Sequence, residues 1–166
     1  GFEQIVSVQT RQYRSMIIFG YRKEDIIMVD QNCAYCVEGD LVAKFGIKIC
    51  ELETSKVYLF KEQSHPGRCI VAHKKHVGDM NELTAEERAA YFEDVARVAR
   101  AIMAAFHPDK VNYGAYGDTG HHLHFHLCPK YKDEFEWGGV FLMNPDKKYL
   151  TDAEYAEMIE KIKANM

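Results

Sequence analysis

Four of the eight histidines of this chain lie within six consecutive residues, His121-His122-Leu123-His124-Phe125-His126. Histidine alternates there with apolar residues, and a period of two residues predicts a β-strand over residues 122–128. In such a strand His122, His124 and His126 point to one face, about 7 Å apart from one to the next. The apolar side chains between them point to the other face, where we expect them to pack against a helix.

Three aligned imidazoles permit several kinds of chemistry. Imidazole changes its protonation state near neutral pH, so one ring could attack phosphorus as a nucleophile while others donate hydrogen bonds to phosphate oxygens. Three glycines before the strand would let the backbone approach an anion closely, namely Gly114, Gly117 and Gly120. Histidines two residues apart on a strand can also share a metal ion, and a polar, solvated strand face needs no function at all.

A second candidate site is the Cys-x-x-Cys pair of Cys33 and Cys36. This spacing alone fits half of a zinc site, a redox pair or a chance occurrence. The residues around the pair show no thioredoxin-like strand pattern. Zinc requires two more ligands to complete a tetrahedron. The other cysteines lie in apolar runs, and we expect them to be core residues.

The elements that position these residues follow from local signals. β-branched, aromatic and apolar segments between turn residues predict five strands, at Lys44–Leu52, Lys56–Phe60, Cys69–Ala72, Val111–Tyr116 and His122–Cys128. Thr84 with Glu87, and Thr151 with Glu154, form capping boxes that predict the starts of two helices. Pro108 ends the first of these helices. Short strands with short connections predict an α+β domain with an antiparallel sheet.

Length and composition exclude several classes of protein. A chain of 166 residues, 47% hydrophobic and 28% charged, is expected to form one folded domain rather than a disordered or fibrous chain. The formal net charge of −4 excludes a strongly basic protein that binds nucleic acid regardless of sequence. No apolar run reaches the ~20 residues of a transmembrane helix. The chain has five cysteines, an odd number, and no secretion signal, which predicts a cytoplasmic protein. From the net charge and the lack of a long apolar run we expect neither nucleic acid nor a membrane as a partner.

Two parts of the chain are distinguished by their pattern. Residues 1–29 are interpreted as an N-terminal extension, which starts with Gly1 instead of Met, as an added or truncated sequence would. A short helix is expected over residues 22–30. Residues 30–166 are predicted to form the folded domain.

The histidine strand resembles the hallmark of the histidine triad (HIT) family of nucleotide hydrolases and transferases, His-φ-His-φ-His-φ-φ, in which φ is apolar. Residues 122–128 fit every position of this motif. Asn112 and Gly117-Asp118-Thr119 are similar to the family's Asn and Gly-Gln-Thr/Ser before the triad. Residues 70–76 resemble the family's apolar strand that ends in Lys-x-His. The resemblance covers residues 30–132, most of the chain.

The resemblance implies a HIT-like fold, an antiparallel sheet of five strands with one long helix and a C-terminal helix, in a homodimer. It also implies a hydrolase of purine nucleotides that cleaves a nucleoside 5′-phosphoramidate or a dinucleoside polyphosphate such as diadenosine tetraphosphate. His124 would attack the α-phosphorus and form a covalent nucleotidyl-histidine, which water then cleaves. His126 would bind the phosphate and orient the leaving group, and Thr119 would donate to a phosphate oxygen or to the bridging atom.

The resemblance implies further site residues. Asn112 and Asp118 would contact the nucleotide, and His122 is counted in the catalytic triad. In some related proteins a Cys-x-x-Cys pair binds zinc together with the histidine of Lys-x-His and the first histidine of the triad. Carried over to this chain, the ligands of a structural zinc ion are Cys33, Cys36, His76 and His122, and the metal would hold the N-terminal segment against the active strand.

Two positions depart from the family pattern. Asp118 stands where other members have Gln, and a carboxylate beside phosphate is repulsive unless it is screened or points away. Many members have, shortly after the third strand, an Asp that binds the ribose hydroxyls, and its nearest counterpart in this chain is Lys61. Because Lys cannot accept hydrogen bonds, ribose recognition would differ or shift to Glu62. Two alternatives stay open, a metal-binding or metal-dependent module that uses the histidine cluster, and a nucleotide-binding protein without turnover.

Overall fold

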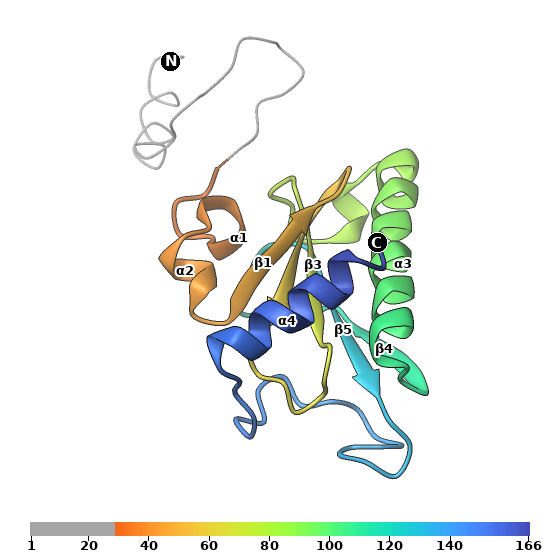
Figure 1. The fold of residues 1–166 in the computed structure, drawn as a ribbon. Coiled ribbons are helices and arrows are strands. Elements are labelled where there is room, and N and C mark those ends of the chain that lie inside the picture. Colours follow the sequence, from red (N-terminus) through yellow and green to blue (C-terminus); the bar gives the residue numbers. More distant parts are fainter. Residues whose placement is uncertain (1–28) are drawn as a thin grey trace, which may run out of the picture.

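The computed structural model describes residues 29–166 (Figure 1). Nearly all of the N-terminal extension, and of the helix expected over residues 22–30, lies outside these residues. The strands are β1 (Gly46–Glu51), β2 (Ser55–Phe60), β3 (Cys69–His73), β4 (Lys110–Gly114) and β5 (His124–Lys130). The helices are α1 (Ala34–Val37), α2 (Asp40–Ala43), α3 (Ala85–Phe106) and α4 (Asp152–Lys163), with a 3-10 turn, η2, at Met80–Glu82.

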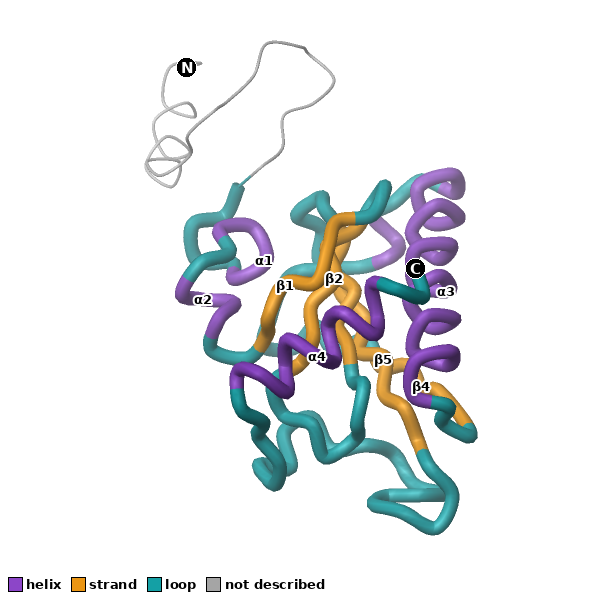
Figure 2. The backbone as a smooth tube through the Cα atoms, viewed as in Figure 1, coloured by secondary structure: helices purple, strands orange, loops and turns teal. Residues whose placement is uncertain are grey.

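The strands form one antiparallel sheet of five strands in the order β1-β2-β3-β5-β4 (Figure 2), which confirms the predicted α+β class. Ala72 on β3 pairs with His124, and Gly114 on β4 pairs with His126. Directly paired residues of an antiparallel sheet share a face. Because Gly114 has no side chain, the rings of Tyr116 and Phe141 fit against it, and the Tyr116 ring lies 6.4 Å from that of His126 between centroids.

Local signals set the limits of the two long helices. The Thr84 hydroxyl accepts from the Glu87 backbone N–H while the Glu87 carboxylate accepts from the Thr84 N–H, and Thr151 and Glu154 do the same. Both starts predicted from the capping boxes are therefore confirmed. α3 ends at Phe106, after which His107 takes a left-handed backbone conformation with φ of 51°. No helix in the described part of the chain is long and apolar enough to cross a membrane.

α3 and α4 cover one face of the sheet (Figure 1). Leu123 and Leu127 belong to the core on this face, as the alternation predicts, together with Val57, Val71, Ile102, Phe125 and Ile159. Asp94 of α3 is a buried carboxylate that accepts hydrogen bonds from the Thr54 N–H and from the hydroxyls of Thr54 and Ser55. This cluster satisfies the buried charge and joins α3 to the turn between β1 and β2.

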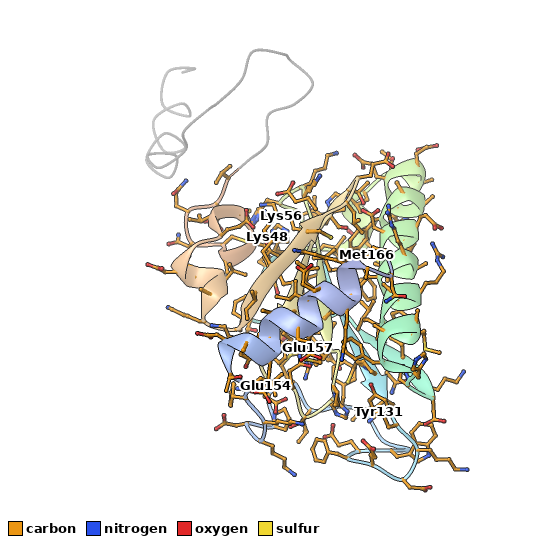
Figure 3. All side chains as sticks on the ribbon, in the orientation of Figure 1. Lys48, Lys56, Tyr131, Glu154, Glu157 and Met166 are labelled. Carbon is orange, nitrogen blue, oxygen red and sulfur yellow. The ribbon has the colours of Figure 1, made fainter. Side chains whose placement is uncertain are left out.

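The short helices α1 and α2 lie on the opposite face, where a second apolar cluster consists of Tyr35, Val42, Tyr58, Phe60, Ile70 and Ala72. Glu38, which follows α1, pairs with Lys48 and Lys56 of β1 and β2 (both labelled in Figure 3). The sequence did not predict these helices. They pack against β1, β2 and β3, and Tyr35 of α1 also reaches the rings of His122 and His124 on the histidine face of β5.

β5 differs from the predicted strand at both ends. It begins at His124, two residues after His122, and continues through Pro129 to Lys130. Leu123 still makes single backbone hydrogen bonds, since its carbonyl accepts from the His73 N–H and its N–H donates to the Val77 carbonyl. The prediction that His122 is a strand residue is therefore wrong, because only isolated bonds and no regular ladder hold the chain there.

Candidate active site

A cavity of about 830 Å³ opens over the histidine side of β5. Its wall contains His122, His124 and His126, the aromatic residues Tyr35, Phe45, Phe60 and Tyr116, and a polar part formed by Asp30, Asn32, His76, Asp118, Thr119, His121 and Asn144. A concave space of this size with apolar walls and a few polar groups is typical of a small-molecule site.

His124 is buried at the base of this cavity, and its Nδ1 lies 2.7 Å from the His122 carbonyl oxygen. A carbonyl only accepts hydrogen bonds, so Nδ1 carries the ring proton and Nε2 keeps its lone pair. Burial lowers the pKa of His124, which keeps the ring neutral near pH 7. His124 therefore has an unprotonated Nε2 available for nucleophilic attack.

His126 has the opposite tautomer. Its ring lies 5.3 Å from the His124 ring between centroids, and its Nδ1 lies 3.3 Å from Nη2 of Arg68. A guanidinium only donates, so Nδ1 accepts and the proton of the neutral ring is on Nε2. Burial and the positive charge of Arg68 lower the pKa of His126 to about 2. The pair thus combines a nitrogen lone pair on His124 with an N–H donor on His126.

His122 faces a different set of residues. Its Nε2 lies 2.7 Å from the His73 carbonyl oxygen and donates to it, so Nδ1 has the lone pair. That Nδ1 lies 3.3 Å from Cys33 Sγ, 3.6 Å from Cys36 Sγ and 3.3 Å from His76 Nδ1. His76 Nδ1 lies 3.2 Å from Cys36 Sγ. The four side chains predicted as metal ligands therefore meet at one point.

The geometry of this cluster fits tetrahedral zinc. The four ligand atoms all lie within 4.8 Å of one another. Zinc–nitrogen and zinc–sulfur bonds of about 2.0 and 2.3 Å place tetrahedral ligand atoms about 3.3–3.8 Å apart, close to the distances in the cluster. Burial raises the pKa of the Cys36 thiol to about 11, so a bound cation is what would make this sulfur a thiolate at neutral pH.

Tyr35 links the cysteine pair to the triad. It lies between Cys33 and Cys36 in the chain, and its ring centroid is 5.2 Å from that of His122 and 5.0 Å from that of His124. Whatever holds the two cysteines therefore also holds a wall of the cavity beside His124. The sequence analysis missed Tyr35, because one aromatic residue in a helix of four residues gives no periodic signal.

The structure brings two of the remaining predicted residues into the cavity and leaves one out. Asp118 and Thr119 are part of the wall. Asn112 lies on β4 and lines two separate hollows together with Gly138 and Gly139. Asn112 also pairs with Cys128 on β5, two residues from His126, so it lies on the histidine face of the sheet and its contact with the nucleotide stays a prediction.

Lys61 and Glu62, considered above for ribose binding, both point to other partners. The Lys61 ammonium donates to the Ala43 carbonyl oxygen. Glu62 is buried, and its Oε1 accepts from the backbone N–H groups of Lys147 and Lys148. Neither residue lines the cavity, so the shift of ribose binding to Glu62 finds no support in the geometry.

The sequence analysis did not single out two buried polar residues near the site. His65 begins the turn that its carbonyl closes by accepting from the Arg68 N–H, and its buried Nε2 lies 2.7 Å from Oε2 of Glu136. Arg68, not singled out by the sequence analysis, is fully buried beside His126. Their partners are 71 and 58 residues away in the chain, so no local pattern predicts either contact.

Comparisons with known proteins agree with the fold and the histidine strand. The HIT domain family model matches residues 46–133. "Protein hit" of Bacillus subtilis is 29% identical over 123 residues, 70% of this chain and 83% of that protein. The adenosine 5′-monophosphoramidase hnt1 of Schizosaccharomyces pombe is 28% identical over 116 residues, 64% of this chain and 80% of that protein.

Solved structures give the same result for the fold. A histidine triad protein from Sinorhizobium meliloti has a TM-score of 0.71 at 21% identity, over 77% of this chain and 95% of that one. A zinc-bound histidine triad family protein from Mycobacterium smegmatis has a TM-score of 0.59 at 22% identity, over 81% and 92% of the two chains.

Fold, histidine strand and family match together define a protein of the nucleotide hydrolase and transferase class. The chain belongs to the HIT domain family, because the family model matches more than half of its length, including the whole sheet and the triad.

Proposed function

We propose that this protein cleaves a nucleoside 5′-phosphoramidate through a covalent nucleotidyl intermediate on His124. The observation that carries the proposal is the hydrogen bond from His124 Nδ1 to the His122 carbonyl oxygen, which leaves Nε2 unprotonated in a ring that lines the cavity. Imidazole in this form attacks without first losing a proton. The name of one relative, an adenosine 5′-monophosphoramidase, supports the same class of substrate.

The reaction has two steps. First, Nε2 of His124 bonds to the α-phosphorus, and the bond from phosphorus to the leaving nitrogen breaks. The leaving nitrogen keeps that electron pair and takes a proton, which passes from solvent through the Thr119 hydroxyl. Second, water bonds to phosphorus, gives up a proton to solvent, and the bond between phosphorus and His124 breaks. In both steps the His126 N–H donates to a phosphate oxygen on which negative charge develops.

The charges in the cavity favour a phosphoramidate over a dinucleoside polyphosphate. Among the described residues that line it, Asp30 and Asp118 bring two carboxylates, and there is neither Lys nor Arg. A chain of several phosphates would bring more negative charge against these carboxylates than a single phosphoramidate does. The aromatic part of the wall, Phe45 and Phe60, offers flat apolar surface to a purine base.

Chromatography of the products tests this proposal. The protein is incubated with adenosine 5′-phosphoramidate, diadenosine triphosphate or diadenosine tetraphosphate, and we expect AMP to be released fastest from the phosphoramidate. Faster cleavage of diadenosine tetraphosphate would change the substrate class. AMP binding with no turnover of any substrate would favour the nucleotide-binding alternative. Loss of activity in folded protein on chelation alone would favour a metal-dependent enzyme.

We also propose that Cys33, Cys36, His76 and His122 hold a structural zinc ion. The tetrahedral spacing of their ligand atoms and the hydrogen bond that fixes the His122 tautomer support this site. The zinc-bound protein of similar fold from Mycobacterium smegmatis is further support. When bound, the metal would supply crosslinking rather than chemistry, because its ligands are linked to His124 through the ring of Tyr35 and the backbone carbonyl of His122, neither of which takes part in the proposed reaction.

A third proposal is that the protein is a homodimer that pairs through the outer side of β4. β4 is an edge strand, and an edge strand has unpaired backbone N–H and C=O groups that a second copy can pair with. Large apolar side chains are exposed around it, including Tyr113 at 52% and Val140 at 83%. Exposed apolar residues gathered at an edge mark an interaction surface.

Light scattering after size-exclusion chromatography tests the dimer. We expect the mass of two chains for the wild type and of one chain for Tyr113→Lys, because a lysine at the edge opposes pairing. Tyr149→Lys, which changes another exposed tyrosine away from β4, is the matched control and should stay dimeric. A wild type that runs as a single chain at high concentration would contradict the proposal.

A further inference from the structure

Arg68 is a buried cation that the reaction steps above do not use. It directly precedes β3 and has no exposed surface. Its guanidinium lies over the ring of Phe60, 4.3 Å from the centroid, and 4.9 Å from the centroid of Phe141. The two aromatic rings exclude water from the charge and give it favourable cation–π contacts.

Within the described part of the chain, the polar contacts of Arg68 include no ion pair, and the carboxylates of Glu62 and Glu136 act on its charge only from beyond hydrogen-bond distance. Nη1 donates to the Leu142 carbonyl oxygen at 3.1 Å, and Nη2 faces both His126 Nδ1 and Met143 Sδ at 3.3 Å. Nε is buried and has no hydrogen-bond partner. In residues 29–166, no carboxylate forms an ion pair with this side chain. Burying a charge that has no ion-pair partner costs free energy of folding, so we expect this arginine to have a role that offsets the cost.

The contact with His126 indicates the role of Arg68. Because Nη2 can only donate, it holds His126 Nδ1 as an acceptor and keeps the ring proton on Nε2. A ring flip would place a C–H group against the guanidinium, and the other tautomer would place an N–H group there. Arg68 itself is not part of the cavity wall, whereas His126 is, so Arg68 acts on the cavity through His126.

We propose that Arg68 is a positioning residue for the phosphate: it fixes the tautomer of His126 that donates from Nε2, and its charge is balanced by the anionic phosphate of the bound nucleotide. The second half of this statement rests on the proposed function, because it requires a phosphate beside His126. The first half concerns the protein without ligand and can be tested apart from activity.

A purely structural role is the competing explanation. Arg68 contacts Leu142 and Met143, so it also holds the segment after Trp137 against the sheet. In that case its loss would lower stability and nucleotide binding together. In the positioning role, an apolar side chain of similar length removes a buried unpaired charge, and the folded state should be at least as stable without it.

The experiment compares Arg68→Met and Arg68→Lys with the wild type and with Arg100→Met, which removes the same charge from the exposed face of α3. Ring 15N NMR reports the tautomer of His126, calorimetry reports AMP affinity, and thermal unfolding reports stability. We expect Nε2–H in the wild type, a mixture of tautomers in Arg68→Met, and at least about tenfold weaker AMP binding with no loss of melting temperature. Arg68→Lys keeps the charge but not the planar fork, so it should restore part of the AMP affinity. Arg100→Met should match the wild type.

The outcomes separate this proposal from the proposed function. A wild-type His126 protonated on Nδ1 would overturn the positioning role of Arg68. An Arg68→Met variant with unchanged tautomer and AMP affinity would overturn it as well. A parallel loss of melting temperature and affinity in both variants, with the tautomer unchanged, would show a structural role. If Arg68→Met does not fold, the wild-type tautomer and the AMP affinity of Arg68→Lys decide the proposal, and an affinity unchanged from wild type in Arg68→Lys would overturn it. Weakened AMP binding in Arg68→Met, beside a wild type that cleaves no phosphoramidate, would support Arg68 while the proposed reaction fails.

Discussion

Replacing His124 with alanine is expected to lower the rate of AMP release from adenosine 5′-phosphoramidate by about 10⁴-fold or more, with little effect on stability. Removing a nucleophile removes the covalent route itself, and losses of this size are observed when nucleophiles are deleted. What remains is uncatalysed hydrolysis helped by whatever phosphate contacts persist. The measurement is the single-turnover rate of AMP formation at saturating substrate.

Stability should change little because the His124 ring faces the cavity and, within residues 29–166, its side chain hydrogen-bonds only to the nearby His122 carbonyl. Alanine at this position leaves the ladder between β3 and β5 intact, since the ladder uses only backbone groups. AMP binding should also persist, because the aromatic wall and His126 remain. The variant would then bind product without forming it, which separates loss of chemistry from loss of the site.

The matched control is His107→Asn, which changes an exposed histidine at the end of α3. His107 has a left-handed backbone conformation, and Asn tolerates this conformation better than most residues, so the helix end is preserved. We expect wild-type rates from this control. A His124→Ala variant that keeps a tenth or more of the wild-type rate would exclude a nucleotidyl intermediate on His124 and would favour attack by water, with the histidines as binding groups.

The parts of the fold that the sequence predicted are those set by neighbouring residues. Each capping box spans four residues, and the alternation of histidine with leucine and phenylalanine identifies both the strand and the face that the core occupies. α1 and α2 were not predicted, because helices of four residues have too few turns to give a periodic pattern. They form only because Tyr35 and Val42 pack on the sheet, which is a tertiary effect.

The candidate site divides in the same way. His122, His124, His126 and Thr119 follow from a continuous motif, and all four line the cavity. The tautomers of His122 and His126 could not be predicted, because they depend on the His73 carbonyl and on Arg68, which are 49 and 58 residues away. Asn112 was predicted from its residue type and its distance from the triad. It lies on β4 beside Gly138, and its contact with the nucleotide stays a prediction.

Replacing Cys36 with serine is expected to abolish stoichiometric zinc and to lower the melting temperature by roughly 10 °C or more. Serine is a poor zinc ligand, and losing one of four ligands leaves His76 and His122 Nδ1 facing each other at 3.3 Å without a cation between them. We expect about one zinc per chain in wild-type protein purified without added metal or chelator. Metal analysis and thermal unfolding measure the two effects, and Cys50→Ser, outside the cluster, is the matched control.

The same variant tells a structural metal from a catalytic one. If zinc only crosslinks α1 to the segment before β5, then Cys36→Ser kept cold enough to stay folded should retain the nucleophile His124, whose tautomer is set by a backbone carbonyl and not by the metal. The rate of AMP release by this variant should fall only to the extent that the Tyr35 ring moves away from the His124 ring. A metal content near zero in the wild type would remove the zinc proposal altogether. A folded Cys36→Ser variant as inactive as His124→Ala would instead place the metal in the chemistry, because a shift of Tyr35 or of the His122 carbonyl, the two links from the cluster to His124, leaves the nucleophile itself present.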